Sequence, residues 1–257
     1  MLKQVMAVQG DQETASTPDL WAASFAGSAV MTAKRRRRMR RSIEWELIRR
    51  YVSEGAAVLD AGCGFGEWVD VLADAGYEAT GVDYSAELVS RLRESYPLSR
   101  WIQGDIRKMP VPDKSFDAVV SWGVIEHDEA GPIAALREFW RVLRPGGMII
   151  VTVPWNSECQ RRASEVLFPN GPKAAFFQYT MQTSELAEFC SAAGFEPVRS
   201  GTTPGASFAM LAPRLVVWLR GHGLVGRVME RIGGMVASRF QRYHLMTYVV
   251  ARKREGV

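Results

Sequence analysis

Short runs of consecutive apolar residues alternate along this chain with segments in which apolar positions recur every three or four residues. The runs have the length and uniform apolarity of strands that are buried on both faces of a sheet. We expect parallel strands at residues 58–61, 77–83, 100–105, 116–122 and 148–153. The intervening segments predict helices at residues 67–75, 85–95 and 132–143. Strands separated by helices predict an α/β fold, with a parallel sheet between two layers of helices.

The N-terminal part of the chain differs from this alternating region. Residues 1–20 are polar and rich in turn-forming residues, and we expect them to be mobile. Apolar residues at helical spacing predict a helix at residues 43–51 that packs on the sheet. The chain is therefore expected to consist of an N-terminal extension with a basic helix, residues 1–42, and one large domain, residues 43–257.

A glycine-rich loop follows the first predicted strand. Gly62, Gly64 and Gly66 alternate along it, and glycines let a backbone come close to a bound molecule. The N–H groups of the loop and of the following helix could receive an anionic group of that molecule, such as a carboxylate. The glycines are spaced one residue more tightly at the end than in the G-x-G-x-x-G fingerprint of dinucleotide-binding proteins. The loop therefore predicts a ligand site, and its spacing disfavours a dinucleotide.

Acidic residues stand at the ends of the first three strands. Asp60 would repel a pyrophosphate, but it suits a ligand that carries an ammonium and a sulfonium, as S-adenosyl-L-methionine (SAM) does. Asp83 ends the second strand, 23 positions later, where it can accept hydrogen bonds from ribose hydroxyls. Asp105 ends the third. These acids should meet at the carboxyl edge of the sheet, where open α/β folds bind ligands.

Five motifs occur in order along the chain. They read VLDAGCGFG, GVDYS, GDI, FDAVVSWGVIEH and EFWRVLRPGGMIIVTVP. With these motifs the sequence resembles the class I SAM-dependent methyltransferases, in particular the small-molecule group around the ubiquinone and menaquinone methyltransferases. The likeness spans residues 43–154 and resumes weakly at residues 183–195. It implies a Rossmann-like, doubly wound sheet of seven mostly parallel strands, with a sixth strand at residues 195–200 and an antiparallel last strand at residues 245–252.

The resemblance also implies which residues bind the cofactor. Gly62 and Gly64 would contact its methionine part, Asp83 its ribose, and Asp105 with Ile106 its adenine. For Ser121 and Trp122, at the end of the fourth strand, contact with the cofactor and ordinary packing are both open. The full set of expected cofactor-binding residues is Asp60, Gly62, Cys63, Gly64, Asp83, Tyr84, Asp105, Ile106, Ser121 and Trp122.

The candidate catalytic residue is His127, directly after the fourth strand. This position places it at the ligand edge, and imidazole titrates close to neutral pH, so it could remove a proton from a methyl acceptor. Relatives with very different substrates share the Glu126-His127 pair, which favours a structural or pocket-shaping role instead. Glu126 is a weaker candidate, for which hydrogen bonding to backbone is the alternative. Tyr179 and His244 could also reach the pocket.

The cysteine and histidine content narrows the class of protein. Three cysteines without a C-x-x-C spacing and three scattered histidines support neither a disulfide framework nor a zinc site. The N-terminal residues lack a signal-peptide pattern, and no apolar stretch approaches the length of a transmembrane span. We therefore expect a cytoplasmic protein with no metal.

Positive charge is concentrated in two segments. The net charge of the 257 residues is +4, yet residues 34–41 hold seven cations and no acid, and residues 214–255 hold nine cations against two acids. The rest of the chain is therefore acidic. The first basic run could be a solvated helix face, a contact for RNA or anionic lipid, or a lid over the cofactor.

Two segments fall outside the expected core, on the substrate side of the sheet. Residues 155–182 carry aromatic side chains that could wall a substrate pocket or pack as an ordinary cap. Residues 205–243 mix apolar and basic side chains, so they could contact an anionic membrane surface, bind a lipid-like substrate or simply cover the sheet. The aromatic residues in question are Phe168, Phe176, Phe177 and Tyr179.

The sequence thus favours a SAM-dependent methyltransferase that acts on a small molecule, anionic or lipid-like, at oxygen. RNA methylation through the basic run and carbon methylation of a lipid-like or quinone-like acceptor are alternatives with the same cofactor. Nucleic acid is disfavoured, because the fourth strand lacks the Asn/Asp-Pro-Pro-Tyr motif of amino-group base methylases and no Pro-Cys nucleophile occurs. A nicotinamide-dependent oxidoreductase and a non-catalytic scaffold are the alternatives from other classes.

Overall fold

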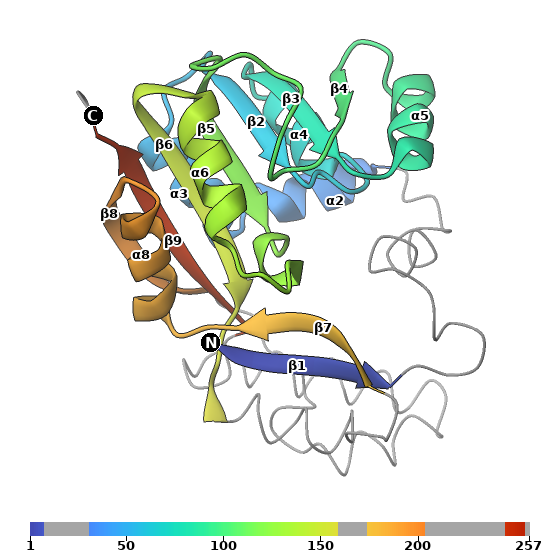
Figure 1. Cartoon of the computed structure of the whole chain (residues 1–257). Helices are drawn as coiled ribbons and strands as arrows, with labels where there is room; N and C mark the ends of the chain where they lie inside the picture. The colour runs from blue at the N-terminus through green and yellow to red at the C-terminus, as the bar shows by residue number, and fades with distance from the viewer. Residues whose placement is uncertain (8–30, 159–173, 204–244, 255–257) are drawn as a thin grey trace.

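The computed structural model describes residues 1–7, 31–158, 174–203 and 245–254 (Figure 1). The side chains at positions 2–7 and 174–177 are not part of the description. The predictions made for Phe168, His244 and residues 205–243 therefore lie outside the described residues, as do those for the side chains of Phe176 and Phe177.

Seven strands form one mixed sheet in the order β4-β3-β2-β5-β6-β9-β8. Neighbouring strands from β4 to β6 are parallel, whereas β9 is antiparallel to both β6 and β8. The strands are β2 (Ala57–Ala61), β3 (Glu78–Asp83), β4 (Arg100–Gln103), β5 (Phe116–Trp122), β6 (Leu143–Pro154), β8 (Phe195–Thr203) and β9 (Met246–Lys253). The predicted fold class is confirmed. Since the strand order reverses between β2 and β5, their carboxyl ends define the crevice where this kind of sheet binds ligands.

Helices cover both faces of the sheet (Figure 1). One face packs against α3 (Ile43–Tyr51), α4 (Glu67–Ala73) and α5 (Ala86–Ser95), and the other against α6 (Ile133–Val142) and α8 (Thr183–Ala192). Two serines fix where helices begin: the side chain of Ser42 accepts the Trp45 N–H, and that of Ser85 accepts the Leu88 N–H. Such N-caps satisfy backbone donors that have no partner within the helix.

The strand boundaries agree with the expectation to within a few residues, with two informative exceptions. β6 begins at Leu143, directly after α6, because Leu143 already pairs with Phe116 of β5. The sequence pattern predicted a start at residue 148, beyond the Pro-Gly-Gly turn. The second exception is Asp105, which lies beyond the end of β4 in an isolated bridge with Lys108.

The prediction that residues 1–20 are mobile is wrong for the first of them. β1 (Leu2–Ala7) pairs antiparallel with β7 (Ala174–Thr180) in a separate two-stranded sheet. This small sheet lies beside the carboxyl ends of the large one (Figure 1), where β7 packs against the end of β6. Part of the segment at residues 155–182 is therefore a regular strand. Local composition could not reveal this pairing, since the partner strand is far away along the chain.

The basic run forms the short helix α2 (Ala33–Met39), which packs on α4. Three of its arginines pair with the three acids of α4 and its C-cap: Arg35 with Glu67, Arg36 with Asp70 at 2.7 Å, and Arg40 with Asp74 at 2.7 Å. The remaining cations of the run are exposed, and they are Lys34, Arg37, Arg38 and Arg41. The run is therefore only partly the solvated face that one of the interpretations predicted.

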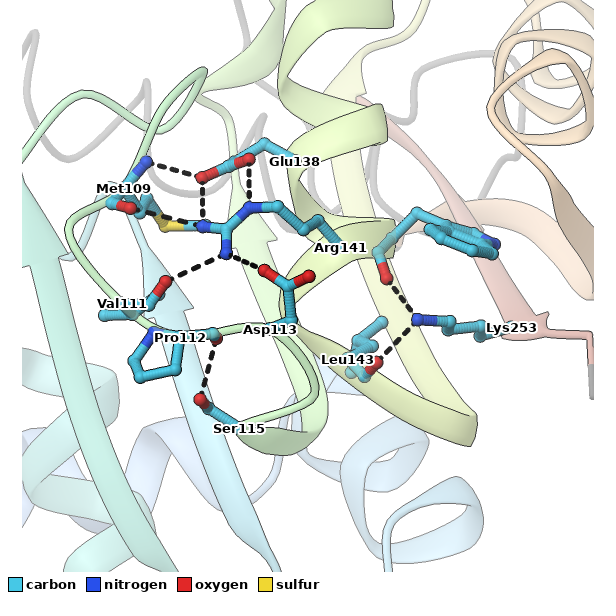
Figure 2. A network of polar contacts seen from close by, with 10 residues as sticks. Met109, Val111, Pro112, Asp113, Ser115, Glu138, Arg141, Leu143 and Lys253 are labelled. Atoms are coloured by element: carbon cyan, nitrogen blue, oxygen red, sulfur yellow. Dashed lines mark hydrogen bonds and ion pairs between the residues drawn. The ribbon is translucent and has the colours of Figure 1, made fainter. Parts of the chain in front are cut away.

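A polar network ties the loop after β4 to α6 (Figure 2). The Arg141 guanidinium donates to the Glu138 carboxylate, to Asp113 at 2.6 Å and to the backbone carbonyls of Met109 and Val111. Glu138 also accepts the Met109 N–H at 2.6 Å. Although burial raises the pKa of Glu138, the hydrogen bonds from Arg141 lower it on balance. The network fixes the loop that carries two of the expected cofactor residues.

A second polar contact in Figure 2 closes the end of α6. Lys253, from β9, is buried, and its Nζ donates to the carbonyls of Trp140 and Leu143 at 2.7 Å each. The same ammonium lies 3.8 Å from the centroid of the Trp140 ring. A cation at a helix C-terminus satisfies carbonyls that lack intrahelical partners. β9 and α6 are thereby held together.

We expect replacement of Arg141 by alanine to lower the free energy of unfolding by roughly 3 kcal/mol, because the buried Glu138 carboxylate would lose its cation. Urea denaturation measures the loss. The matched control is Arg91→Ala, which removes an exposed pair with Glu87 and should cost less than about 0.5 kcal/mol. Equal losses in the two variants would contradict a stabilising role for the network.

Candidate active site

The glycine loop between β2 and α4 has left-handed backbone at all three glycines. The φ angles are +82° at Gly62, +49° at Gly64 and +70° at Gly66. Packing adds a second requirement, because a Cβ at Gly62 would lie 2.5 Å from Val124 and one at Gly66 would lie 2.3 Å from Trp101. Glycine is therefore demanded by the protein's own neighbours as well as by any ligand.

The N–H groups of this loop are largely engaged within the chain. Gly62 and Cys63 both donate to the carbonyl of Val82, at 2.8 and 2.9 Å. Gly64 donates to the Asp83 carboxylate at 2.9 Å, and the Gly66 N–H bonds the Cys63 carbonyl. The expectation that loop N–H groups receive a ligand carboxylate therefore finds no support at these four amides.

Asp60 is a buried carboxyl without a complete set of partners. It lies at the end of β2, is 1% exposed, and its Oδ1 has no hydrogen-bond partner among the described residues. Burial, together with the nearby Asp83, raises the pKa of Asp60 to about 8. An unpaired buried carboxyl is costly, so its position at the switch point between β2 and β5 suits a ligand that brings positive charge.

Asp83 joins the end of β3 to the loop. Its two carboxylate oxygens accept the N–H groups of Gly64 and Ser85, at 2.9 and 3.0 Å. Tyr84, the next residue, is 56% exposed, and its carbonyl accepts a hydrogen bond from the Gln103 side chain. The carboxylate is thus held at the carboxyl edge by backbone donors, with the Tyr84 ring in solvent beside it.

Asp105 and Ile106 follow β4. The Arg107 guanidinium pairs with the Asp105 carboxylate at 2.7 Å, and chiefly through these hydrogen bonds it lowers the pKa of Asp105. Arg107 also reaches Asp128 at 3.4 Å. Ile106 is half-buried and packs against the main core cluster. The structure therefore places both residues at the sheet edge, with the acid oriented by Arg107, which the sequence motifs did not predict as a site residue.

Ser121 and Trp122 end β5 and point to opposite faces of the sheet. The buried Ser121 hydroxyl donates to the Ala61 carbonyl at 2.9 Å, which ties β5 to the end of β2. The Trp122 ring packs on Trp68 of α4 with 5.2 Å between ring centroids. The Trp122 Nε1 is buried and has no acceptor among the described residues. Trp68 was not predicted; its only sequence signal is its place one residue into α4.

The helical turn η2 (Ile125–His127) follows β5 and packs against β6 and β7. Glu126 is 1% exposed, and its Oε2 has no partner among the described residues. Burial raises the pKa of this carboxyl to about 8. The His127 side chain is 13% exposed, and its Nε2 lies 3.9 Å from Glu126 Oε1. Tyr179 of β7 also reaches this region, since its hydroxyl donates to the Glu129 carbonyl at 2.9 Å.

Most of the buried side-chain polar atoms that lack a partner in the described chain gather at the carboxyl ends of β2, β5 and β6. They are Asp60 Oδ1, Trp122 Nε1, Glu126 Oε2 and Asn156 Oδ1. Native proteins leave few such atoms unsatisfied, and those that remain mark functional places or missing ligands. Asn156, two residues after the end of β6, was not predicted as a site residue, because nothing in the sequence around it shows that its side-chain oxygen is buried.

The described residues contain no group of three or more histidine, cysteine, aspartate or glutamate side chains placed to hold a metal ion. Cys63 and Cys190 are buried, unpaired thiols, and burial raises the pKa of each. Within the described part of the chain, no helix combines the length and apolarity needed to cross a membrane.

Comparison with known proteins agrees with this geometry. Residues 59–151 match a family model described as a methyltransferase domain. A Mycolicibacterium smegmatis protein described as an S-adenosylmethionine-dependent methyltransferase is 36% identical over 166 residues, 62% of this chain and 60% of that protein. The malonyl-[acyl-carrier protein] O-methyltransferase of Pectobacterium atrosepticum is 38% identical over 95 residues, 37% of each chain. The demethylmenaquinone methyltransferase of Bacillus licheniformis is 35% identical over 106 residues, 38% of this chain and 45% of that protein.

A solved structure resembles the chain over nearly its whole length. The methyltransferase in a Haloferax volcanii complex with the activator Trm112 superposes with a TM-score of 0.64 at 21% identity, covering 93% of this chain and 96% of that one. The fold is therefore that of the class I methyltransferases, whose cofactor is SAM. Within it, residues 59–151 are the part that is similar to the methyltransferase-domain family model. The chain spans at most about 60% of the length of the curated relatives given above.

The raised pKa of Asp60 gives a signed prediction for the ligand-free protein. Between about pH 4 and 8 the folded state holds a proton that the unfolded state releases, so the free energy of unfolding should fall as pH rises. Asp60→Asn should remove the pH dependence that Asp60 causes. The variant should be more stable than wild type at pH 8 by roughly 1–3 kcal/mol. Urea denaturation across this pH range measures the effect.

The matched control for Asp60 is Asp117→Asn, at the opposite edge of the sheet. Although burial raises the pKa of Asp117, the hydrogen bonds from Arg144 and from the Ala57 N–H lower it on balance. The asparagine variant should therefore be less stable than wild type at pH 8, and the deficit should shrink as pH falls through the range of an ordinary carboxyl. Shifts of the same sign in the two variants would contradict the assignment of Asp60 as an unpaired acid.

Alanine substitutions at two left-handed glycines should separate backbone strain from packing. Gly62 and Gly76 have φ angles of +82° and +88°, so each substitution should cost about 1–2 kcal/mol through the backbone. A Cβ at Gly76 meets nothing within 4 Å, whereas at Gly62 it meets Val124. Gly62→Ala should therefore cost roughly 1–3 kcal/mol more in thermal or urea unfolding, and Val124→Ala should recover much of that excess. Equal costs would contradict the contact between loop and turn.

Proposed function

We propose that this protein is a SAM-dependent methyltransferase that transfers a methyl group to oxygen of a small-molecule acceptor. The observation that carries the proposal is the buried, incompletely partnered carboxyl of Asp60 beside the glycine loop. A sulfonium and an ammonium, both present in SAM, supply the positive charge that this position lacks. The methyltransferase domain at residues 59–151 supports the same activity.

The proposed cofactor site extends along the carboxyl ends of β2, β3 and β5. Gly62, Cys63 and Gly64 would contact the methionine part near Asp60, and Asp83 with Tyr84 would contact the ribose. Asp105 and Ile106 would border the adenine. Trp122 is supported by its unpartnered Nε1, which can donate to a cofactor oxygen, whereas the Ser121 hydroxyl is already used by Ala61.

Methyl transfer needs little covalent chemistry from the protein. The acceptor attacks the sulfonium methyl in line with the bond to sulfur, and holding the two reactants in that geometry can contribute about 7–11 kcal/mol. A hydroxyl acceptor must also lose its proton, for which η2 offers ionisable side chains. Under this proposal, the residues at the ends of β2 and β3 orient the methyl donor, and η2 and β7 face the methyl acceptor.

The names of two relatives bear on the acceptor. One is an O-methyltransferase that acts on malonyl-[acyl-carrier protein], and the other a demethylmenaquinone methyltransferase. Oxygen is favoured by the incompletely partnered carboxyl of Glu126, which can take a proton from a hydroxyl. Carbon methylation of a quinone-like acceptor is the second candidate. An anionic or lipid-like acceptor and peripheral membrane contact stay predictions, as does a cytoplasmic location.

Two other functions fit the described residues less well. RNA methylation through the basic run has fewer cations at its disposal, since three arginines pair with α4. A nicotinamide dinucleotide would bring a pyrophosphate close to the Asp83 carboxylate, where like charge opposes it.

SAM should raise the unfolding temperature of the wild-type protein in a thermal-shift titration, and NADH should not. Asp83→Ala should weaken SAM binding by at least about tenfold in calorimetry, because it removes both the proposed ribose acceptor and the carboxylate that holds the Gly64 N–H. Glu78→Ala, at the exposed start of the same strand, is the control and should bind SAM as wild type does. Stabilisation by NADH alone would contradict the proposed function.

A further inference from the structure

Glu126 occupies a confined position at the end of β5. A Cβ at Gly123 would lie 3.4 Å from Glu126 Oε1 and equally close to the Met246 side chain, so the carboxyl folds back against the Gly123 backbone directly after β5. Val124, two residues before it, is the side chain that abuts Gly62 in the glycine loop. The segment from Val124 to Glu126 therefore packs against the proposed cofactor loop at one residue and holds a buried carboxyl two residues further on.

The groups around Glu126 do not neutralise it. From its own turn, His127 Nε2 stands 3.9 Å away from Oε1. Asp128, the next acid, pairs with Arg107, and from β7 the Tyr179 hydroxyl donates to the Glu129 carbonyl. No lysine or arginine pairs with Glu126 among the described residues, and its Oε2 has no hydrogen-bond partner there. A buried carboxyl in this state awaits a hydrogen-bond donor.

We propose that Glu126 is a catalytic residue that contacts the acceptor and removes the proton of its hydroxyl, so that the acceptor is a hydroxyl compound rather than a carboxylate. The inference rests on the proposed function and deepens it. It replaces His127 as the first proton acceptor, leaving the histidine as a neighbour that can pass the proton outward.

The acceptor hydroxyl gives its proton to Glu126 Oε2, and the oxygen forms a bond to the methyl carbon. The bond between that carbon and sulfur breaks, and its electron pair stays on sulfur. A sulfonium and a carboxylate thus become a neutral thioether, S-adenosylhomocysteine, and a neutral carboxylic acid. The proton then leaves towards solvent, for which His127, more exposed than Glu126, offers a path.

Burial tunes the proposed base. It raises the pKa of Glu126 to about 8, which makes the carboxylate a far stronger base than an exposed glutamate. General bases work best when their pKa lies near the working pH. A carboxylate acceptor would use this residue differently, since it needs a hydrogen-bond donor and no base. A glutamine at this position distinguishes a hydroxyl acceptor from a carboxylate acceptor, because its amide donates a hydrogen bond but cannot take the proton.

The test compares Glu126→Gln with wild type in the full chain. S-Adenosylhomocysteine release is measured with hydroxyl probes, catechol and 1-decanol, and with carboxylate probes, benzoate and decanoate. With a hydroxyl probe, kcat of the variant should fall about 100-fold or more while the dissociation constant for SAM stays within about threefold. Wild-type kcat/KM should rise with pH up to about 8, and this rise should be absent in the variant. Glu129→Gln, the same change at an exposed position three residues on, should keep wild-type kcat.

The outcomes are distinguishable. Wild-type turnover of a hydroxyl probe with full activity in Glu126→Gln would overturn the role of Glu126 and leave the methyltransferase intact. Turnover of carboxylate probes alone would overturn the acceptor class, as would SAM binding without turnover of any hydroxyl probe. Failure of SAM to bind the wild-type protein would overturn the proposed function itself. Circular dichroism of the variant shows whether a loss of turnover reflects unfolding.

Discussion

The central constraint on this structure is the buried carboxyl of Asp60, which lacks a full set of hydrogen-bond partners in the folded chain. Asp60 sits at the buried end of β2, at the switch point where the strand order reverses between β2 and β5, and no described residue completes its hydrogen bonding. Such a group lowers stability, so the rest of the fold must hold it in place. Parallel strands on both sides do so, and the loop that begins two residues later wraps against Val82 and Asp83. The energetic cost of Asp60 thus falls at a place where a cationic ligand can relieve it.

Much of this architecture follows from sequence periodicity, because buried parallel strands are uniformly apolar and their helices carry one apolar face. The acids at strand ends could be predicted for the same reason: a strand of known direction delivers its last residue to a known edge. The hydrogen bonds and packing contacts within the glycine loop could not be predicted. Whether the amide of Gly64 is available to a ligand depends on Asp83, nineteen residues on, and whether Gly62 is needed depends on Val124. Asn156 was missed because burial of a single polar atom has no local signature, and Trp68 because its ring contact with Trp122 joins two elements far apart along the chain.

The basic run at residues 34–41 could be recognised from the sequence, but its ion-pair partners could not. A run of cations at residues 34–41 is obvious in the sequence, but their use depends on the acids that α4 presents when it packs alongside. Positions 35, 36 and 40 fall on the side of α2 that meets α4, and positions 34, 37, 38 and 41 on the other side, as the 3.6-residue period requires. The helix thus braces the element that begins at the glycine loop. That contact joins the predicted extension to the domain more closely than its sequence boundary implies.

The pairing of β1 with β7 has a consequence for how the chain is made. A ribosome releases the first strand long before its partner, because more than 160 residues separate Ala7 from Ala174. Until then β1 has no partner strand. Pairing between strands so far apart in the sequence is also slow, because a long loop must close. The large sheet can assemble around β2 to β6 in the meantime. The small sheet beside its carboxyl edge can therefore close only after all the parallel strands of the large sheet have been synthesised, although β8 and β9 of that sheet emerge later still.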